Sequence, residues 1–376
     1  MAMPFLRFIK DDGSNYPDWN NISLNQVFTE VKEKNRTNLP VLSVKQGYGT
    51  VLRDKSGINM VYSKANLKNY KAMKKDDFII HLRSFEGGLE CSNYDGISSP
   101  AYKILRCNNL ILPSVYKYYF RSKSFISNKL SKAVIGIRDG KNIDMDIFWK
   151  ISISVPCLEE QQKIADFLSD IDAQIEHYQQ SLDNLEAQKK ELLRQVFSQE
   201  LRFKRDNGSD YPDWEKDKLE NIVGNVSSGR TNKSNTGKVL LYGSTGIIGY
   251  CDNEDYPNCK LLIARVGANC GFVNYVDVSC GVTDNTLIIN DTNKCHLKWL
   301  YYMLTVQKLN RYSKSNVKPL ITGTLVKNLC LLFPCPEEQQ KIADFFTDFD
   351  YRIALERQRL QTMQEVKKGL LQQMFC

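Results

Sequence analysis

One stretch of the sequence carries residues whose types and spacing could support metal-dependent hydrolysis of DNA. Pro17-Asp18 followed by Glu30-Val31-Lys32 fits the Pro-Asp…Glu-x-Lys pattern of metal-dependent nucleases. The Pro-Asp pair recurs at Pro212-Asp213, but the positions equivalent to Glu30 and Lys32 are Asn225 and Ser227. The shared Tyr-Pro-Asp-Trp therefore favours a structural turn over a catalytic site.

Other signs of catalysis or metal binding are weaker still. Gly229 to Gly237-Lys238 is too long for a phosphate-binding loop, and Val239 stands where Ser or Thr would hold magnesium. Gly243 to Gly249 lacks the spacing of a dinucleotide fingerprint and favours an exposed turn. The 11 cysteines include no Cys-x-x-Cys pair and the 3 histidines are far apart, so we expect neither a disulfide framework nor a metal site. We predict no catalytic residues.

An internal repeat organises the elements that could position functional residues. Residues 7–19 (RFIKDDGSNYPDW) match residues 202–214 (RFKRDNGSDYPDW) at an offset of 195. Residues 156–172 match residues 334–350 at an offset of 178, and both copies contain Glu-Glu-Gln-Gln-Lys-Ile-Ala-Asp. Each copy is a globular segment followed by a long helix. Short apolar runs between turn residues predict strands, and 116–120 and 299–304 predict short helices.

The two long helices each carry an apolar stripe. Each helix starts with a proline and two acidic residues, after which apolar residues recur in steps of four and three. The first stripe, from Ile164 to Val196, is interrupted at Lys189, and the second, from Ile342 to Met374, at Glu356 and Lys367. The lysines mark where we expect the seam to be least tightly packed. Two heptad stripes in matching register predict a coiled coil. The helices should be antiparallel, because the second globular segment joins the end of one to the start of the other.

These patterns predict an α+β protein with a pseudo-two-fold internal repeat. Two mixed α/β domains are separated by an antiparallel two-helix coiled coil. The predicted segments are the first domain, the first helix, the second domain and the second helix, at 1–155, 156–204, 205–333 and 334–376.

Charge is distributed unevenly between these segments. Residues 158–200 hold 10 acidic and 4 basic residues, and residues 336–376 hold 7 and 6. The other 292 residues hold 41 basic and 26 acidic residues, a net charge of +15. Two basic domains on a non-basic spacer are typical of a protein that binds a polyanion, and the pseudo-two-fold suits duplex DNA. The domains differ in sequence, so we expect an asymmetric site with an unread spacer.

The compartment follows from what the sequence lacks. No apolar run reaches the roughly 18 residues of a membrane span, and residues 1–7 do not resemble a signal peptide. We expect a soluble protein of the cytoplasm with no membrane partner.

Two variable domains, each leading through Pro-x-x-Glu-Gln-Gln-Lys-Ile-Ala into a long helix, resemble the DNA-specificity subunit of type I restriction–modification systems. The most specific marks are Glu160-Gln161-Gln162 and Glu338-Gln339-Gln340; the Tyr-Pro-Asp-Trp lead-ins and Tyr242-Gly243-Ser244-Thr245-Gly246 also fit. The resemblance covers essentially the whole chain. It implies a non-catalytic DNA-binding subunit in which each domain reads one half of a bipartite site. It also implies that the helices set the spacer and dock two methyltransferase subunits.

The same resemblance implies where the cofactors reside. Methyltransferase subunits would bind S-adenosylmethionine and methylate adenine N6, for which the base leaves the stack. Restriction subunits that translocate DNA would use ATP and magnesium. No cofactor and no metal is expected on this chain.

Candidate contact residues come from turns shared by both domains, since loops on a rigid scaffold usually bear recognition. In the first domain the predicted DNA contacts are Lys45, Tyr48, Arg83, Ser84, Ser98 and Ser99. In the second domain they are Arg230, Lys233, Tyr242, Ser244, Thr245, Arg265, Thr283 and Asn285. Arg83 and Arg265 occupy matching positions, which favours a shared role such as phosphate binding. The predicted contacts to methyltransferase subunits are Gln161, Gln162, Asp166, Gln339, Gln340 and Asp344.

Two other functions stay open on the sequence. The chain could serve a related system that organises methylation and cleavage differently, which neighbouring genes would reveal. It could also be a coiled-coil scaffold whose basic domains bind something other than DNA, which a salt-dependent duplex-binding assay would reveal. The variable domains offer no base code, so the sequence predicts no DNA target.

Overall fold

The computed structural model describes residues 4–55, 64–136, 141–256, 260–290, 295–313 and 319–375. The chain divides into two compact units. Unit 1 comprises Met1–Gln179 and Gln358–Cys376, and unit 2 comprises Gln180–Arg357. Gln179 and Arg357 are 178 residues apart, so the boundary crosses the two long helices at equivalent positions of the repeat. Each unit therefore contains one domain and part of each helix.

Unit 1 is built around a four-stranded antiparallel sheet with the order β2-β9-β6-β7. The pairs β1–β12, β3–β4, β5–β8 and β10–β11 complete its sheets. Its strands are β1 Asn20–Ser23, β2 Phe28–Val31, β3 Leu42–Lys45, β4 Gly49–Leu52, β5 Lys71–Met73, β6 Phe78–Ile80, β7 Glu90–Cys91, β8 Gly96–Ser98, β9 Lys103–Cys107, β10 Val134–Ile135, β11 Asn142–Ile143 and β12 Ser152–Val155. Its helices are α1 Leu24–Val27, α2 Ser84–Gly87, α3 Pro113–Tyr119, α4 Met145–Trp149 and the first part of α5 Leu158–Phe197.

Unit 2 repeats this plan with the four-stranded antiparallel sheet β14-β20-β17-β18. A three-stranded sheet, β16-β15-β19, and the pair β13–β21 accompany it. Its strands are β13 Glu215–Lys218, β14 Val226–Ser228, β15 Val239–Gly243, β16 Gly246–Cys251, β17 Lys260–Ala264, β18 Val273–Val276, β19 Gly281–Val282, β20 Thr286–Asn290 and β21 Cys330–Phe333. Its helices are α6 Leu219–Ile222, α7 Leu297–Gln307, α8 Gly323–Lys327 and the first part of α9 Pro336–Met374.

The repeat extends to the register of the strands. Asn20 of β1 lies opposite Val155 of β12, and Glu215 of β13 lies opposite Phe333 of β21. These partners are related by the same offsets, 195 and 178, that relate the sequence repeats. The predicted short helices are confirmed as parts of α3 and α7. One fold thus occurs twice, with the same strand order and the same pairing at its edge.

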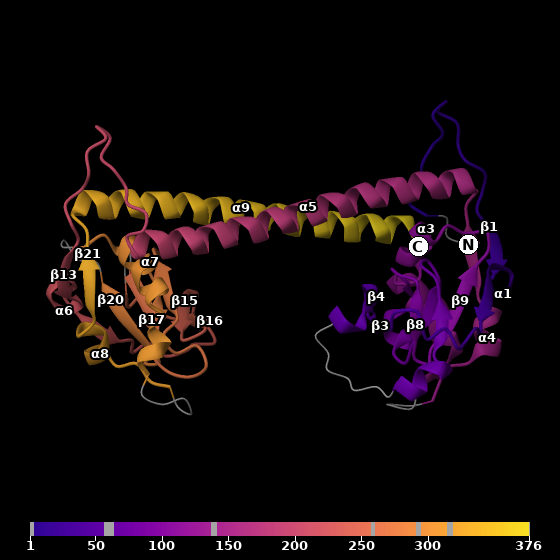
Figure 1. Ribbon diagram of the computed structural model, residues 1–376, viewed down its shortest axis with the longest axis horizontal. Coiled ribbons are helices and arrows are strands. Elements are labelled where there is room, and N and C mark those ends of the chain that lie inside the picture. Colours follow the sequence, from indigo (N-terminus) through magenta and orange to yellow (C-terminus); the bar gives the residue numbers. More distant parts are fainter. Residues whose placement is uncertain are drawn as a thin grey trace. The chain divides into compact units, whose positions relative to one another are not determined.

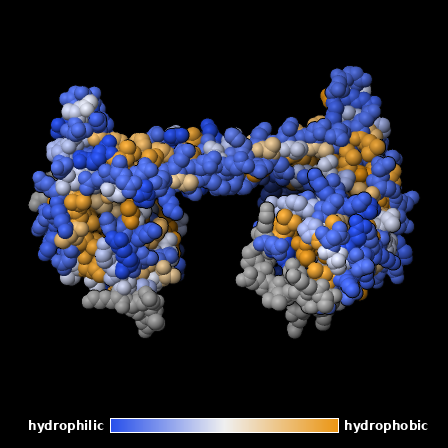
Figure 2. All heavy atoms as spheres, in the orientation of Figure 1, coloured by the Kyte–Doolittle hydropathy of each residue, from blue (hydrophilic) through white to orange (hydrophobic). Residues whose placement is uncertain are grey.

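Helices α5 and α9 pack together, and both contribute to each domain core (Figure 1). In unit 1 Leu168, from the start of α5, shares a core with Met374, from the end of α9. In unit 2 the opposite ends of the helices meet, because Val196, from the end of α5, shares a core with Phe346, from the start of α9. Within each unit the two helices are therefore antiparallel, as expected. On the face in Figure 2 the helices present mostly hydrophilic residues, as amphipathic helices with buried stripes should.

Candidate nucleic-acid interface

The Tyr-Pro-Asp-Trp lead-ins are fastened to the starts of the long helices. In unit 1 the Arg7 guanidinium donates to both carboxylate oxygens of Glu160 at 3.0 and 2.9 Å, and Trp19 Nε1 donates to the same group at 3.0 Å. Arg7 Nη2 also donates to the carbonyl of Pro17 at 2.7 Å. Glu160 is fully buried, and its hydrogen bond raises the pKa of Arg7. Glu160, the first residue of the Glu-Gln-Gln motif, therefore has a structural role.

Unit 2 contains the same cluster. Arg202 donates to Glu338 at 3.3 and 3.0 Å, Trp214 Nε1 donates to Glu338 at 3.0 Å, and Arg202 Nη2 donates to the carbonyl of Pro212 at 2.8 Å. Glu338 is also fully buried. We call each Arg–Glu–Trp set a latch: Arg7, Glu160 and Trp19 in unit 1, and Arg202, Glu338 and Trp214 in unit 2.

The first glutamine of each motif faces inward, which corrects its predicted role. Gln161 accepts a hydrogen bond from the amide of Leu112 at 2.7 Å and donates to the carbonyls of Leu110 and Pro156, both at 2.9 Å. Gln339 accepts from the amide of His296 and donates to the carbonyl of Pro334, both at 2.9 Å. The two side chains are buried. Gln161 and Gln339 therefore join helix to domain and offer no surface to a partner.

The remaining predicted partner contacts are exposed and arranged identically in the two helices. Gln162 donates to Asp166 at 2.7 Å, and Gln340 donates to Asp344 at 2.8 Å. Each pair is spaced four residues apart, so it lies on one helix face. The chain thus presents the same polar patch twice.

A second repeated cluster joins both helices to each domain. In unit 1 Asp172 of α5 accepts from the hydroxyl of Tyr118 on α3 and from Lys367 of α9. The Lys367 ammonium also lies 4.7 Å from the ring centroid of Tyr118. Burial raises the pKa of Tyr118, which keeps its hydroxyl a donor. We call this set of Tyr118, Asp172 and Lys367 the unit 1 joint.

The unit 2 joint consists of Tyr302, Asp350 and Lys189. Asp350 of α9 accepts from Tyr302 at 2.5 Å and from Lys189 of α5. The Lys189 ammonium lies 5.1 Å from the ring centroid of Tyr302, and burial raises the pKa of Tyr302. Both lysines that interrupt the apolar stripes are therefore paired, not loosely packed as the sequence suggested.

The predicted DNA contacts of unit 1 fall into two groups. Lys45 and Tyr48 are exposed at the turn between β3 and β4, and the Lys45 ammonium lies 5.3 Å from the Tyr48 ring centroid. Arg83 is exposed before α2, and Ser99 is half-buried after β8. Ser84 and Ser98 are fully buried, and Ser84 Oγ accepts from the amide of His81 at 2.9 Å. Ser84 and Ser98 therefore cannot reach a base in this structure, which corrects their prediction.

The β3–β4 turn is held by a pair that the sequence analysis missed. Fully buried Glu90 accepts from the amide of Gly47 at 2.6 Å and from the Arg121 guanidinium. Arg121 Nη1 donates to the carbonyl of Gly47 at 3.2 Å, and Asn93 Nδ2 donates to the carbonyl of Tyr48 at 3.1 Å. Only the fold brings these residues together, because Glu90 and Arg121 are 31 positions apart. These hydrogen bonds hold in place the turn that bears Lys45 and Tyr48.

In unit 2 backbone hydrogen bonds gather several predicted contacts. The amide of Thr283 donates to the carbonyl of Tyr242, and the amide of Arg265 donates to the carbonyl of Asn285, both at 3.0 Å. Ser244 and Thr245 form the turn between β15 and β16. The exposed members of the predicted set are Arg230, Lys233, Thr245 and Asn285, and the half-buried members are Tyr242, Ser244, Arg265 and Thr283. All eight side chains have some exposure.

Two further features of the domains were not anticipated. Ile247 and Tyr250 are 56% and 51% exposed on β16, beside the predicted Ser244-Thr245 turn. Arg83 and Arg265 differ in their surroundings, because Arg83 lies in an exposed turn whereas Arg265 is half-buried directly after β17. The different exposure of the two arginines therefore does not support a shared role such as phosphate binding.

The nuclease-like residues occupy structural positions. Glu30 lies on β2, 4.0 Å from the ammonium of Lys103, and Asp18 lies 3.8 Å from the Arg7 guanidinium. Within the described ranges no three His, Cys, Asp or Glu side chains gather closely enough to hold a metal ion. None of the helices formed by the described residues is long and apolar enough to span a membrane.

In comparisons with known proteins, most of the chain matches one protein family. The family described as "Type I restriction modification DNA specificity domain" matches residues 17–187 and 208–365. The chain is 29% identical over 109 residues to the EcoprrI specificity subunit of Escherichia coli, covering 29% of this chain and 27% of that protein. It is 24% identical over 319 residues to the MjaVIII specificity subunit of Methanocaldococcus jannaschii, covering 73% of this chain and 72% of that protein. Among solved structures, the S subunit from M. genitalium has a TM-score of 0.65 at 16% identity, covering 100% of this chain and 99% of that one.

Proposed function

The chain belongs to the family of type I restriction–modification DNA specificity proteins, and on this premise we propose how its two domains divide DNA recognition. Each domain reads one half of an asymmetric, two-part site on double-stranded DNA. The base pairs between the halves are not read. The observation that carries the proposal is one fold repeated with different turn residues, Lys45 and Tyr48 in unit 1 and Ser244 and Thr245 in unit 2. Equal folds with unequal surfaces suit one site with two different halves.

The proposed readers are the exposed members of the candidate sets. Tyr48 and Lys45 project from a turn that buried Glu90 and Arg121 fix in place, so these side chains are presented on a rigid support. In unit 2 Thr245, Lys233 and neighbouring residues line the β15–β16 hairpin and the strands beside it. Lysine and arginine suit phosphates and guanine, whereas hydroxyls and amides suit base edges. The excess of basic residues in the domains supports this role.

The paired helices serve as spacer and docking site. The joints fasten each domain to both helices, and the latches fasten each domain to the start of one helix. In this proposal the length of helix between the two joints therefore sets the separation of the two half-sites. Two methyltransferase subunits dock on the repeated polar patch, one at Gln162 and Asp166 and the other at Gln340 and Asp344. A patch that occurs twice in the same form supports two copies of one partner.

In this proposal the chemistry belongs to partner subunits. The methyltransferase subunits bind S-adenosylmethionine and transfer its methyl group to adenine N6 after the base leaves the stack. Restriction subunits use ATP and magnesium to translocate and cut DNA that lacks the mark. The chain contributes sequence recognition, spacing and docking, and its family membership supports this division.

Sequencing of methylated adenines in a host with and without the gene tests the proposal. We expect one gene-dependent motif with two unlike halves around an unspecified spacer. Binding of the chain to duplex DNA should weaken steeply as salt rises, because phosphate contacts release counterions. A host whose methylation is unchanged by the gene, together with no duplex binding at low salt, would favour the scaffold alternative.

A further inference from the structure

We infer that a pocket of unit 1, between residues 121–128 and the last turns of α9, binds the phosphate backbone of DNA beside the recognition turn of the first domain. This inference rests on the proposed function and extends it. It assigns a DNA contact to α9, a helix that the proposed function uses only as a spacer and docking site.

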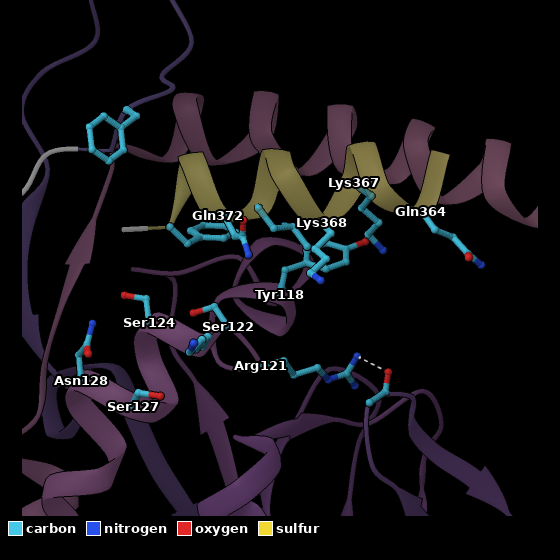
Figure 3. Close-up of a pocket in the computed structure, with 15 residues that line it drawn as sticks. Tyr118, Arg121, Ser122, Ser124, Ser127, Asn128, Gln364, Lys367, Lys368 and Gln372 are labelled. Atoms are coloured by element: carbon cyan, nitrogen blue, oxygen red, sulfur yellow. Dashed lines mark hydrogen bonds between the residues drawn. The ribbon is translucent and has the colours of Figure 1, made fainter. Parts of the chain in front are cut away.

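The pocket lies where the domain meets α9 and has a volume of about 790 Å³. Figure 3 shows α9 on one side and the segment that carries Ser124, Ser127 and Asn128 on the other, with Lys368 extending from α9 toward Tyr118. Gly47 of the β3–β4 turn also lines it. A strand of DNA held here would therefore pass directly beside the turn that presents Lys45 and Tyr48.

The charges that line the pocket leave two lysines available. Arg121 is neutralised by Glu90, and Lys367 by Asp172. Lys123 and Lys368 are exposed, and neither has an ion pair or hydrogen bond with any described residue. One lysine stands on each side of the pocket. Two free ammonium groups facing one space suit adjacent phosphates of one strand.

The polar part of the neutral lining supports an anionic occupant, while Phe5, Leu371 and Phe375 form an apolar part. Hydroxyl and amide groups, which can donate to phosphate oxygens, border the pocket: Ser122, Ser124, Ser127, Asn128, Gln364 and Gln372. Of the described residues that line it, none is Asp or Glu. Phosphate contacts of this kind position a protein on the duplex without reading its sequence.

The repeat provides an internal comparison that argues for a site specific to unit 1. Lys190 of α5 is the counterpart of Lys368 at the offset of 178, but Gln364 and Gly369 are replaced there by Glu186 and Glu191. At the offset of 195, Phe5, which lines the pocket, is replaced by Glu200. Glu191 and Glu200 both accept hydrogen bonds from Arg194, at 2.8 and 2.6 Å. The segment that carries Lys190 therefore has three carboxylates, Glu186, Glu191 and Glu200, where unit 1 has neutral residues. They are paired with Arg357 and Arg194, so unit 2 does not repeat the acid-free lining of the unit 1 pocket.

The test measures the salt dependence of binding between the full chain and a labelled duplex that carries the site found by methylation sequencing. Each phosphate contact contributes about 0.9 to the slope of log K against log salt. We expect Lys123→Gln with Lys368→Gln to lower that slope by about 2. The ratio of affinities for the cognate duplex and one with a changed half-site should stay the same. Lys123→Arg with Lys368→Arg should retain the slope.

Lys190→Gln is the matched control, and we expect it to leave the slope unchanged. An unchanged slope in the double variant would overturn the phosphate site while leaving the proposed function intact. A fall of about half that size in the control, which removes one charge where the double variant removes two, would overturn it as well, since the effect would then come from net charge. Weaker co-purification of methyltransferase subunits at an unchanged slope would mark the pocket as a protein contact. No duplex binding by the unaltered chain would contradict the proposed function itself.

Discussion

Lys367 of α9 forms an ion pair with Asp172 of α5, and Lys189 of α5 forms the same pair with Asp350 of α9. The two pairs are related by the offset of 178 in both partners. In each, the aspartate also accepts a tyrosine hydroxyl from the neighbouring domain. A single carboxylate therefore ties three segments together, and it does so once in each unit. The two lysines that interrupt the heptad stripes thus lie where the domains are fastened to the helices.

Loss of a joint should destabilise the contact between a domain and its helices. Asp172→Ala leaves the Lys367 ammonium and the Tyr118 hydroxyl, both partly buried, without their acceptor, and we expect a cost of about 1–3 kcal/mol. Thermal unfolding should report the loss. Asp170→Ala, on the exposed face of the same helix, should stay within about 0.5 kcal/mol of the unaltered chain. Equal stabilities of the two variants would show that the joint is not a stabilising contact.

Loss of a latch should act on one unit at a time. Glu160→Ala leaves Arg7 without its buried partner, a change that typically costs about 3–5 kcal/mol. Hydrogen exchange should then accelerate in residues 7–19 and stay unchanged in residues 202–214. Glu338→Ala should give the reverse pattern. Glu159→Ala, at an exposed first-turn position, is the control and should affect neither segment. Exchange that rises in both segments with either variant would argue against independent latches.

The repeat and the two long helices could be predicted because they leave periodic marks in the sequence, and the antiparallel direction followed from the way the second domain connects the helices. The roles of single polar residues could not. Gln161 and Gln162 are adjacent and identical in type, yet one is buried against backbone groups of Leu110 and Leu112 and the other is exposed. Only the packing of the domain against the helix determines which of the two glutamines is buried. Lys367 likewise interrupts an apolar stripe for a reason found 195 residues away, in Asp172.

Burial also decided between the candidate DNA contacts. Ser98 and Ser99 are neighbours with the same side chain, but Ser98 faces the interior and Ser99 is half-buried. A turn pattern cannot show which of two serines faces inward when strand register is unknown. The support of the β3–β4 turn by Glu90 and Arg121 is equally a product of tertiary packing. Sequence patterns predicted where the turns lie, whereas tertiary packing determines which of their side chains are exposed.

Docking of the methyltransferase subunits should depend on the exposed polar patches. Asp166→Lys with Asp344→Lys reverses one charge in each patch while leaving the buried Gln161 and Gln339 in place. We expect fewer methyltransferase subunits to co-purify, because like charges would then oppose the surface that the patches normally fit. Glu365→Lys, an exposed charge reversal near the end of α9, should leave the stoichiometry unchanged. Full stoichiometry with both patch substitutions would exclude these residues from the interface.

Spacer length should depend on the helical segment between the joints. Four residues inserted after Gln179 and four after Arg357 lengthen both helices by about 6 Å at the unit boundary and leave every joint intact. Four residues make about one turn, so the apolar stripe keeps its facing, whereas two would rotate it out of the seam. We expect the four-residue variant to methylate sites whose spacer is longer by about one or two base pairs, at 3.4 Å each. The two-residue variant should lose most activity. Full activity at an unchanged spacer in the four-residue variant would show that the helices do not set the spacing.

The central claim is that each domain reads its own half of the site, and exchange of one domain tests it most directly. Residues 20–150 are replaced with the equivalent domain of a relative. The latch residues Arg7, Trp19 and Glu160 all lie outside this range and are retained. The methylated adenines of a host that carries the hybrid are then sequenced. The account predicts that one half of the motif changes while the other half and the spacer stay the same. A hybrid that alters both halves together, or neither, would contradict independent reading by the two domains.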